Sequence, residues 1–518
     1  MISKQLVLTG LSLTLSGVLS ACKTDSLKKP NQSLLLSSQY SNEHKVQLFQ
    51  AKSSLLVGLT PYLGRGTTDL RPGKELNLRS VGRPLTLKDV SGVKHKSIDI
   101  TITWRKVPLL KRELIERQVV GPFASFESAE RLAERLRNKG VPAIVTHPKE
   151  WEVWVPQGAV LPKEIQFESR TEVKTSTLVP VLKGQSGEIP LSGPLYIEAP
   201  DGLLWGNGVY LGPFWLKADA YGSWTLVEEV PIERYLLGVV PHEIGFSAPP
   251  VALATQAVLA RTWALANSHR FAVDGYHLCS NTQCQVYKDP QKANPRIKSA
   301  ISNTAGKYLS FQNKPIHAVY HASNGGVMAA VTEAWSMAPV PYLKVEFDGP
   351  KTWKQKFSLP FQDQSAVKTF LTNKDGAYGN THRRFRWLRT LSAQDIKTAM
   401  KLFEDSNTMP YRLRVLKRGP SGRVLSLEIS SKENQLTEVL ELDEIRRVLR
   451  NLPSTLFVVN ELKEGSWQFV GGGFGHGAGL SQAGAIDLAQ RGWTVSEILR
   501  HYYPGTIIRT LQDLPKAP

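Results

Sequence analysis

Residues 230–287 decide the fold: VPIERYLLGVVPHEIGFSAPPVALATQAVLARTWALANSHRFAVDGYHLCSNTQCQVY. An apolar segment, YLLGVV, precedes a single carboxylate, Glu243, and an alanine-rich segment with helical spacing follows. Pro241 is expected to end the apolar segment, because proline removes a backbone donor. Pro249 and Pro250 suit the first turn of the next helix. The sequence therefore predicts Glu243 in a turn at the start of that helix.

Glu243 is a candidate general acid. A carboxyl group against an apolar wall has a raised pKa, because burial disfavours the charged form. Its proton is then available to a leaving group near neutral pH. The alternative is a surface acid that the helix dipole favours at a helix start. Gln256 and Arg261 are unusual among the small residues of the same helix, and they are candidate substrate-binding residues.

The composition describes a large basic protein with globular domains. The chain has 518 residues, 41% of them hydrophobic, and a formal net charge of +19. This length predicts about two to four domains. The positive charge suits an anionic partner, such as nucleic acid, an acidic membrane surface or a wall polymer. The sequence contains no RNA-binding, zinc-finger or helix-turn-helix pattern, which argues against nucleic acid.

The N-terminus is typical of an exported protein. Residues 1–21 form a short apolar run that ends in small residues, which predicts a signal peptide rather than a membrane span. The end of the run, LSAC, resembles a bacterial lipobox. The resemblance implies a membrane-anchored lipoprotein with lipidated Cys22, and the alternative is an ordinary signal peptide with an incidental cysteine. Residues 22–45 are polar and predict a flexible tether. No later stretch is long and apolar enough to span a bilayer.

A small module is expected before the main domain. Residues 46–110 are β-rich and are candidates for the first strands of that domain. Residues 111–165 predict a strand, a helix capped by Ser125 and two further strands. Their GPF and helix segment resembles a SPOR domain, a module that binds peptidoglycan glycan strands lacking stem peptides. The alternative is a generic βαβ piece packed inside the larger fold. The module is an insertion if the strands before it belong to the later domain.

The closely spaced cysteines allow three interpretations. An even pair in an exported protein usually forms a disulfide, here Cys279 with Cys284. The same two residues could hold zinc with His277 and one further ligand. Free thiols are the third alternative.

Two later segments carry polar residues next to glycines. In AVYHASNGG, residues 318–326, strand alternation separates Tyr320 from His321 and Ser323, and Gly325 and Gly326 allow a close backbone approach. This segment predicts the edge of a cleft, or else a plain hairpin. The second segment, GGGFGHGAGLSQAGA at residues 471–485, lacks the Lys-Ser/Thr ending of a phosphate loop. Its histidine faces whatever the loop approaches, unless the glycines only form a structural turn.

The order of these motifs, together with ILRHYYPGT near the C-terminus, is similar to that of the SpoIID/LytB family. The resemblance covers about residues 175–512. It implies an α+β, multi-domain protein, with a β-rich catalytic domain whose helices flank a cleft. SpoIID proteins are lytic transglycosylases of glycan strands that lack stem peptides, and LytB-type relatives are described as enhancers of an amidase. The resemblance thus implies a cell-wall protein whose partners are peptidoglycan strands and a cell-wall amidase.

Motif by motif, the resemblance assigns roles to residues. Glu243 matches the catalytic glutamate, which protonates the glycosidic oxygen after N-acetylmuramic acid and then acts as base on the 6-hydroxyl, leaving a 1,6-anhydro end. The other matches are cleft residues: Tyr320, His321, Ser323, Gly325, Gly326, His476, Ser481 and Gln482.

The sequence departs from the family at two places. Ile244 and Gly245 stand where Met and Pro are usual after the glutamate. Gln283 stands where a histidine often precedes the second cysteine. Some relatives bind zinc near these cysteines, so the missing histidine favours a disulfide, although His277 remains available. No cofactor is expected, and zinc at these residues is the alternative.

Overall fold

The computed structural model describes residues 54–65, 73–184, 187–361, 363–406, 408–432, 436–449, 452–463 and 465–514. The predicted signal peptide, the tether and Cys22 lie outside these residues. Within them, no helix combines the length and apolar character that crossing a membrane requires.

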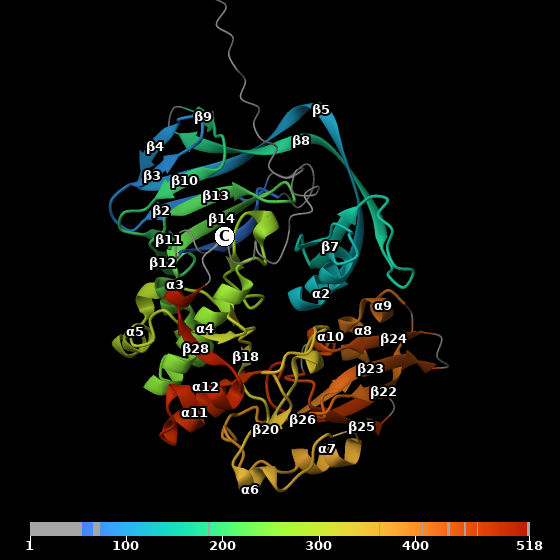
Figure 1. Cartoon of the computed structure of the whole chain (residues 1–518). Helices are drawn as coiled ribbons and strands as arrows, with labels where there is room; N and C mark the ends of the chain where they lie inside the picture. Colours follow the sequence, from blue (N-terminus) through green and yellow to red (C-terminus); the bar gives the residue numbers. More distant parts are fainter. Residues whose placement is uncertain are drawn as a thin grey trace, which may run out of the picture.

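Two sheets form the upper part of the molecule (Figure 1). The first has, in order, β15 (Leu278–Cys279), β1 (Ser54–Leu63), β14 (Trp224–Pro231), β13 (Phe214–Ala218), β10 (Leu195–Glu198), β3 (Leu85–Lys88) and β4 (Lys94–Ser97). The second has β12 (Gly208–Tyr210), β11 (Leu203–Trp205), β2 (Leu76–Ser80), β5 (Asp99–Phe123), β7 (Trp151–Pro156) and β6 (Ile144–Thr146), with β8 (Glu168–Gly184) and β9 (Gly187–Pro190) beside β5. Strands from before and after the module therefore share both sheets.

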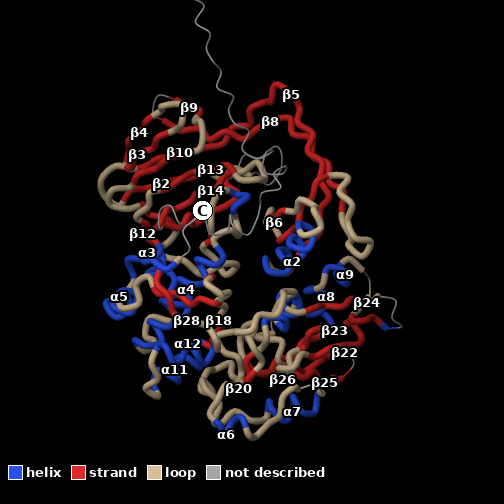
Figure 2. Tube along the Cα trace, viewed as in Figure 1, coloured by secondary structure: helices blue, strands red, loops and turns tan. Residues whose placement is uncertain are grey.

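The module at residues 111–165 sits at the end of a long ribbon. The strands β5 and β8 pair antiparallel and run out from the upper sheets to α2 (Phe126–Arg137), as Figure 2 shows. Ser125 caps α2 by accepting from the Ser128 amide, as predicted. The hydrophobic core of the module contains Trp151. It also contains Phe271 and Tyr276, which come from the segment at residues 230–287. The module is thus packed onto the central domain, by which we mean the described parts of residues 54–110, 166–345 and 473–514.

Two helices lie between the sheets and the lower half of the molecule: α3 (Ile232–Ile244) and α4 (Pro250–Asn267). Helix α4 begins at Pro250, as predicted, and is buried on every face, because its alanines let neighbouring elements approach closely. Around it pack α5 (Pro295–Ser302), α11 (Gln482–Gln490), α12 (Val495–Tyr502) and β16 (Lys307–Phe311), which pairs with β17 (Lys314–Pro315) and β28 (Ile507–Thr510).

The prediction that Pro241 ends the apolar segment is wrong. Helix α3 continues through Pro241 and closes with a hydrogen bond of 3.1 Å from the Gly245 amide to the Pro241 carbonyl. Proline deletes one backbone hydrogen bond, while residues such as Tyr235 and Val239 are fully buried in the core. Glu243 therefore lies in the last turn of α3 and not at the start of α4.

The C-terminal lobe, residues 346–472, forms the lower right of Figure 1. One sheet joins β21 (Arg386–Ser392), β26 (Ser466–Gly472) and β25 (Phe457–Lys463), and another joins β22 (Pro410–Arg418), β23 (Val424–Ser431) and β24 (Thr437–Glu441). Its helices are α6 (Lys351–Lys354), α7 (Gln364–Leu371), α8 (Ala393–Ala399), α9 (Lys401–Glu404) and α10 (Asp443–Val448), and the short strand β20 (Glu346–Phe347) pairs with β19 (Val327–Met328). The mixed, β-rich α+β class predicted from the sequence is confirmed.

Candidate functional site

Glu243 lines a pocket of about 260 Å³ where the module, the central domain and the C-terminal lobe meet. The pocket mixes aromatic, charged and amide side chains, a lining suited to a polar ligand with apolar faces. Its residues are Ala124, Ser125, Glu127, Glu243, Trp263, Arg270, Thr282, Gln283, Cys284, Val286, Val319, Tyr320, Trp335, Asp443, Arg446 and His476.

The Glu243 carboxyl group is protonated more readily than an ordinary glutamate. Burial raises its pKa from 4.5 to about 7, although a hydrogen bond of 2.9 Å from the Val286 amide opposes the shift. Its place in the last turn of α3 acts in the same direction as burial, since a helix C-terminus disfavours negative charge. Glu243 therefore has the electrostatic setting of a general acid near neutral pH.

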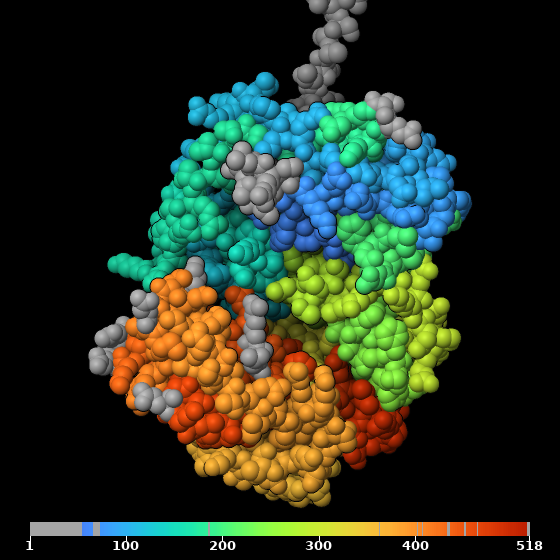
Figure 3. Space-filling model, turned by 180° about the vertical axis from the view of Figure 1, so that it is seen from behind, coloured from blue at the N-terminus to red at the C-terminus, as the bar shows by residue number. Residues whose placement is uncertain are grey.

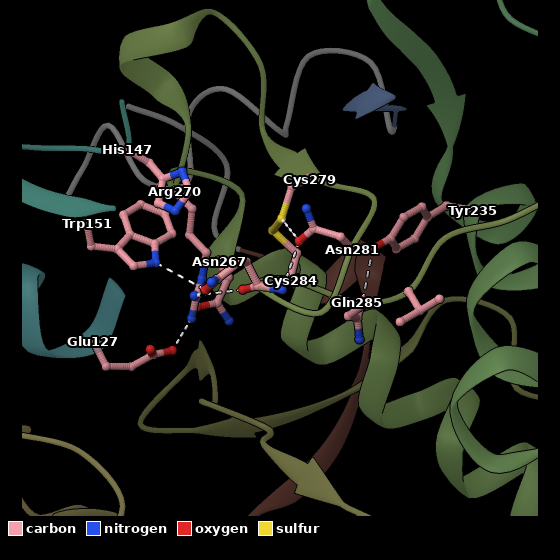
Figure 4. Close-up of a disulfide and its surroundings, with 12 residues drawn as sticks. Glu127, His147, Trp151, Tyr235, Asn267, Arg270, Cys279, Asn281, Cys284 and Gln285 are labelled. Atoms are coloured by element: carbon pink, nitrogen blue, oxygen red, sulfur yellow. Dashed lines mark hydrogen bonds and ion pairs between the residues drawn. A yellow bond between two sulfur atoms is a disulfide. The ribbon is translucent and has the colours of Figure 1, made fainter. Parts of the chain in front are cut away.

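A chain of hydrogen bonds runs beside Glu243. Tyr235 donates to the Gln285 side-chain oxygen at 3.1 Å, and the Gln285 amide nitrogen donates to the Tyr320 hydroxyl at 2.9 Å. Figure 4 shows Tyr235 and Gln285 joined in this way, next to the cysteines. The predicted cleft residue Tyr320 is thus held in place by two residues that the sequence did not single out, Tyr235 and Gln285.

The two glycine-bearing segments meet in space. Strand β18 (Tyr320–His321) pairs in parallel with β27 (Leu480–Ser481), and Ser323 bridges to Phe474, so the hairpin alternative for the first segment is wrong. His476 lines the pocket, and its Nε2 donates to the Tyr320 carbonyl oxygen at 2.9 Å. Burial lowers the pKa of His476 to about 3, so the ring is neutral. The histidine fixes the strand that carries Tyr320.

The glycines of the second segment are required by this close approach. Gly479 has a φ of +70°, and an added Cβ would collide with the Val319 carbonyl oxygen. Gly492 also has a positive φ, +85°, but an added Cβ there meets nothing within 4 Å. A comparison of Gly479 with Gly492 therefore distinguishes the cost of backbone strain from the cost of the steric collision.

Replacement of Gly479 by alanine should destabilise the protein more than replacement of Gly492. Both variants place a side chain in the left-handed region, at about 1–2 kcal/mol. The Gly479→Ala protein should lose about 1–3 kcal/mol more, because the Val319 backbone cannot move away freely. Urea unfolding of both variants measures the difference, and equal losses would contradict the close packing of the two segments.

Arg261 and Gln256 do not reach the pocket, which corrects the prediction that they bind substrate. Arg261 is fully buried and pairs with Glu233, at 2.6 Å, and with the Lys307 carbonyl oxygen. Gln256 is also fully buried and accepts a hydrogen bond of 3.3 Å from the Gln482 side chain. A buried charge or polar group needs a bonding partner. Arg261 and Gln256 both find their partners inside the protein. Both residues fasten α4 to its neighbours.

The other predicted cleft residues support the pocket from behind. His321 is buried, with its Nδ1 at 3.1 Å from the Ala478 carbonyl oxygen. Ser481 caps α11 by accepting from the Gly484 amide. The remaining ones are Ser323, Gly325, Gly326 and Gln482, which lie in the packed contact between the two segments or against its neighbours. None of these six is among the pocket-lining residues.

Cys279 and Cys284 form a disulfide. Its sulfurs are not thiolates, so in this structure they are not available to bind zinc. His277 accepts a hydrogen bond of 3.0 Å at Nδ1 from the Leu56 amide, and burial lowers its pKa to about 4. In the part of the chain that the structure describes, no three His, Cys, Asp or Glu side chains are grouped as a metal site.

The disulfide loop, residues 279–284, is held from the side of the module. The Gln283 side-chain oxygen accepts from Trp151 Nε1 at 3.1 Å. Arg270 forms an ion pair with Glu127 of α2 (Figure 4). Its guanidinium group also stacks on the Phe126 ring. Arg270 neutralises Glu127, and its charge helps to lower the pKa of that carboxyl group against the effect of burial. No local sequence pattern predicts this contact, because its partners lie 143 positions apart.

The third wall of the pocket comes from the C-terminal lobe. Helix α10 contributes Asp443 and Arg446, which form an ion pair of 3.4 Å. The next residue, Arg447, forms an ion pair of 2.7 Å with Glu150 of the module. The module and the lobe are therefore in direct contact beside the pocket.

Two parts of this chain match known protein families. Residues 220–311, which contain Glu243 and the disulfide loop, match the SpoIID family, described as stage II sporulation protein. Residues 329–479, which include the whole C-terminal lobe, match a domain of unknown function, DUF8618.

Three bacterial proteins show similarity over about half of the chain. A stage II sporulation protein D from Bacillus amyloliquefaciens is 28% identical over 54% of this chain and 75% of its own length. The protein of the same name from Bacillus subtilis is 26% identical, with the same coverage. An amidase enhancer from Bacillus subtilis is 30% identical over 53% of this chain and 40% of its own length. These matches support a SpoIID-like family for this chain, which carries a SpoIID family domain at residues 220–311.

Proposed function

We propose that this protein is a cell-wall lytic transglycosylase. It cleaves the bond between N-acetylmuramic acid and N-acetylglucosamine in glycan strands that lack stem peptides. The observation that carries the proposal is Glu243, a half-buried carboxyl group with a pKa of about 7 in the pocket at the junction of three parts of the chain. The similarity to stage II sporulation proteins supports a role in the cell wall.

The chemistry needs one carboxyl group and no cofactor. Glu243 donates its proton to the glycosidic oxygen as the bond to C1 of the muramic sugar breaks. The resulting carboxylate takes the proton of the 6-hydroxyl group of the same sugar, whose oxygen bonds to C1. Glu243 ends protonated, and the product carries a 1,6-anhydro ring without consumption of water.

The other two carboxyl groups of the pocket do not suit the role of a free base. Glu127 forms its ion pair with Arg270, and its side chain is only 9% exposed. Asp443 forms an ion pair of 3.4 Å with Arg446. Ordinary glycosidases use a second carboxylate as nucleophile or as base for water. A reaction in which the substrate supplies the nucleophile therefore fits this pocket better than hydrolysis does.

Product analysis tests the proposal. The protein without residues 1–21 is incubated with denuded glycan strands, and the products are separated and weighed by mass spectrometry. We expect fragments that end in 1,6-anhydro-N-acetylmuramic acid. Fragments with a reducing muramic acid end, which are one water heavier, would show hydrolysis instead, and intact strands would contradict both reactions.

The reaction rate should fall as the pH rises through about 7. The proton on Glu243 is required at the start, and the pKa of about 7 sets where it is lost. The same shift affects stability: the folded protein binds this proton more tightly than the unfolded chain, so the native state loses stability as the pH rises from about 4.5 to about 7. A pH profile of kcat/KM, which reports the pKa of the free enzyme, measures the first effect.

The matched variant for the pH prediction is Glu243→Gln, which cannot lose a proton. Thermal unfolding of both proteins at pH 6 and pH 8 should show a smaller loss of stability in the variant. An unchanged kcat/KM of the wild type between those two pH values would contradict the raised pKa.

The alternative function is that of a wall-binding protein that stimulates an amidase. The similarity to a protein named amidase enhancer favours it. An assay that adds this protein to a cell-wall amidase would support the alternative if stimulation persisted in the Glu243→Gln variant while no strand cleavage occurred in the wild type.

We infer export and anchoring through lipidated Cys22, with the module at residues 111–165 as a SPOR-like glycan-binding unit. The net charge of +19 suits an anionic wall polymer. Metabolic labelling with a fatty acid, compared between the wild type and a Cys22→Ser variant, tests the anchor.

A further inference from the structure

A second and larger pocket lies beside the one that holds Glu243. It measures about 890 Å³, and the two pockets share Thr282 and Gln283 of the disulfide loop. Its lining residues are His147, Lys149, Glu150, Asn281, Thr282, Gln283, Leu391, Asp395, Thr398, Ala399, Arg447, Val448 and Leu449.

The module, the disulfide loop and helix α10 of the C-terminal lobe line both pockets. The module lines the first with residues 124–127 and the second with residues 147–150. Helix α10 lines the first with Arg446 and the second with Arg447, its neighbour in sequence. The disulfide loop lies between them. Because each wall continues from one pocket to the next, the two are adjoining parts of one groove between the module and the C-terminal lobe, whose surfaces lie one above the other in Figure 3.

We propose that this groove holds further sugar units of the glycan strand whose bond lies at Glu243. The inference rests on the proposed function and extends it: the module forms one wall of an extended substrate site, and is not only a separate anchor to the wall.

The chemistry of the second pocket fits a hydroxyl-rich chain that carries a carboxylate on each muramic acid, for which the exposed Lys149 supplies a positive charge. The exposed side chains of Asn281, Thr282 and Thr398 are uncharged hydrogen-bonding groups. Glu150 and Arg447 neutralise each other across the groove at 2.7 Å, which also ties the two walls together. The volume is within the range of about 300–1,000 Å³ that is typical of ligand sites. Sugar hydroxyl groups can therefore replace water along this surface.

The groove predicts a preference for long strands that one substitution should remove. Ala399 is exposed at the end of α8 and lines the second pocket, so a tryptophan there fills the groove. We expect Ala399→Trp to lower the ratio of kcat/KM for long denuded strands to that for the shortest cleavable oligosaccharide about tenfold, which corresponds to about 1.4 kcal/mol. Ala305 is an exposed alanine outside both pockets, and Ala305→Trp should leave the ratio unchanged.

A binding experiment separates this inference from the catalytic proposal. The affinity of the Glu243→Gln protein for denuded strands of increasing length is measured with and without Ala399→Trp. Affinity that rises with length, and rises less with the tryptophan, supports the groove even if no cleavage is ever seen. Affinity that does not depend on length would overturn it. Displacement by a free stem peptide, without a length effect, would assign the groove to peptide instead and would equally overturn the proposal.

Discussion

Replacement of Glu243 by glutamine should abolish most of the strand cleavage. General acid catalysis contributes about 10²–10⁴-fold to a rate, and glutamine cannot donate the proton. The side chain keeps its size and can still accept the Val286 amide hydrogen bond of 2.9 Å with its own oxygen. Rates of anhydro-product formation at pH 6, where the wild-type group holds its proton, measure the loss.

Binding provides the control for this result. Glu243 does not need its charge to hold the strand in the proposed mechanism, so the affinity for denuded strands should change by less than about threefold, a small free-energy change. A variant that still cleaves strands at the wild-type rate would remove Glu243 from the mechanism. A variant that no longer folds is recognised by its unfolding curve.

Replacement of Glu127 by alanine should cause a large loss of stability. Glu127 forms an ion pair with Arg270, whose side chain is 3% exposed. Removal of one partner of a buried pair leaves an uncompensated charge and costs about 3–5 kcal/mol. Because the pair joins the module to the end of α4, cleavage should also weaken. Urea unfolding measures the first effect.

Two further variants serve as controls for the Glu127→Ala result. Glu198 pairs with Lys88 at 3.3 Å on the surface, and its removal should change the stability by about 0–1 kcal/mol. The double variant Glu127→Leu with Arg270→Met removes both charges and should recover much of the loss, since a well-packed apolar pair can replace a buried ion pair. Equal effects of Glu127→Ala and Glu198→Ala would contradict a structural role for the module at the site.

Local sequence signals predicted several elements well. Pro250 opens α4 and Ser125 caps α2, because these residues satisfy or omit backbone donors at a helix start. The expectation for Pro241 failed for a physical reason. The loss of one hydrogen bond is a local effect, whereas the burial of α3 against the sheets depends on contacts that local rules do not contain.

The site was predicted only in part. The position of Glu243 after an apolar segment suggested a buried acid, and strand alternation correctly separated Tyr320, which lines the pocket, from His321 behind it. Arg261 was predicted to bind substrate because a polar residue in an alanine-rich helix is conspicuous. Its guanidinium group instead binds the Glu233 carboxylate and the Lys307 carbonyl oxygen. Sequence alone does not show whether a polar side chain has a partner inside the protein.

The sequence by itself determined the candidate acid, the order of the motifs and the mixed α+β class, because these depend on residue chemistry and local periodicity. Tertiary structure alone decided that Glu243 ends a helix, that burial raises its pKa to about 7, and that the module and the C-terminal lobe form two walls of its pocket. Burial and charge pairing arise between residues far apart in the chain, such as Glu150 and Arg447, and only folding brings those residues together.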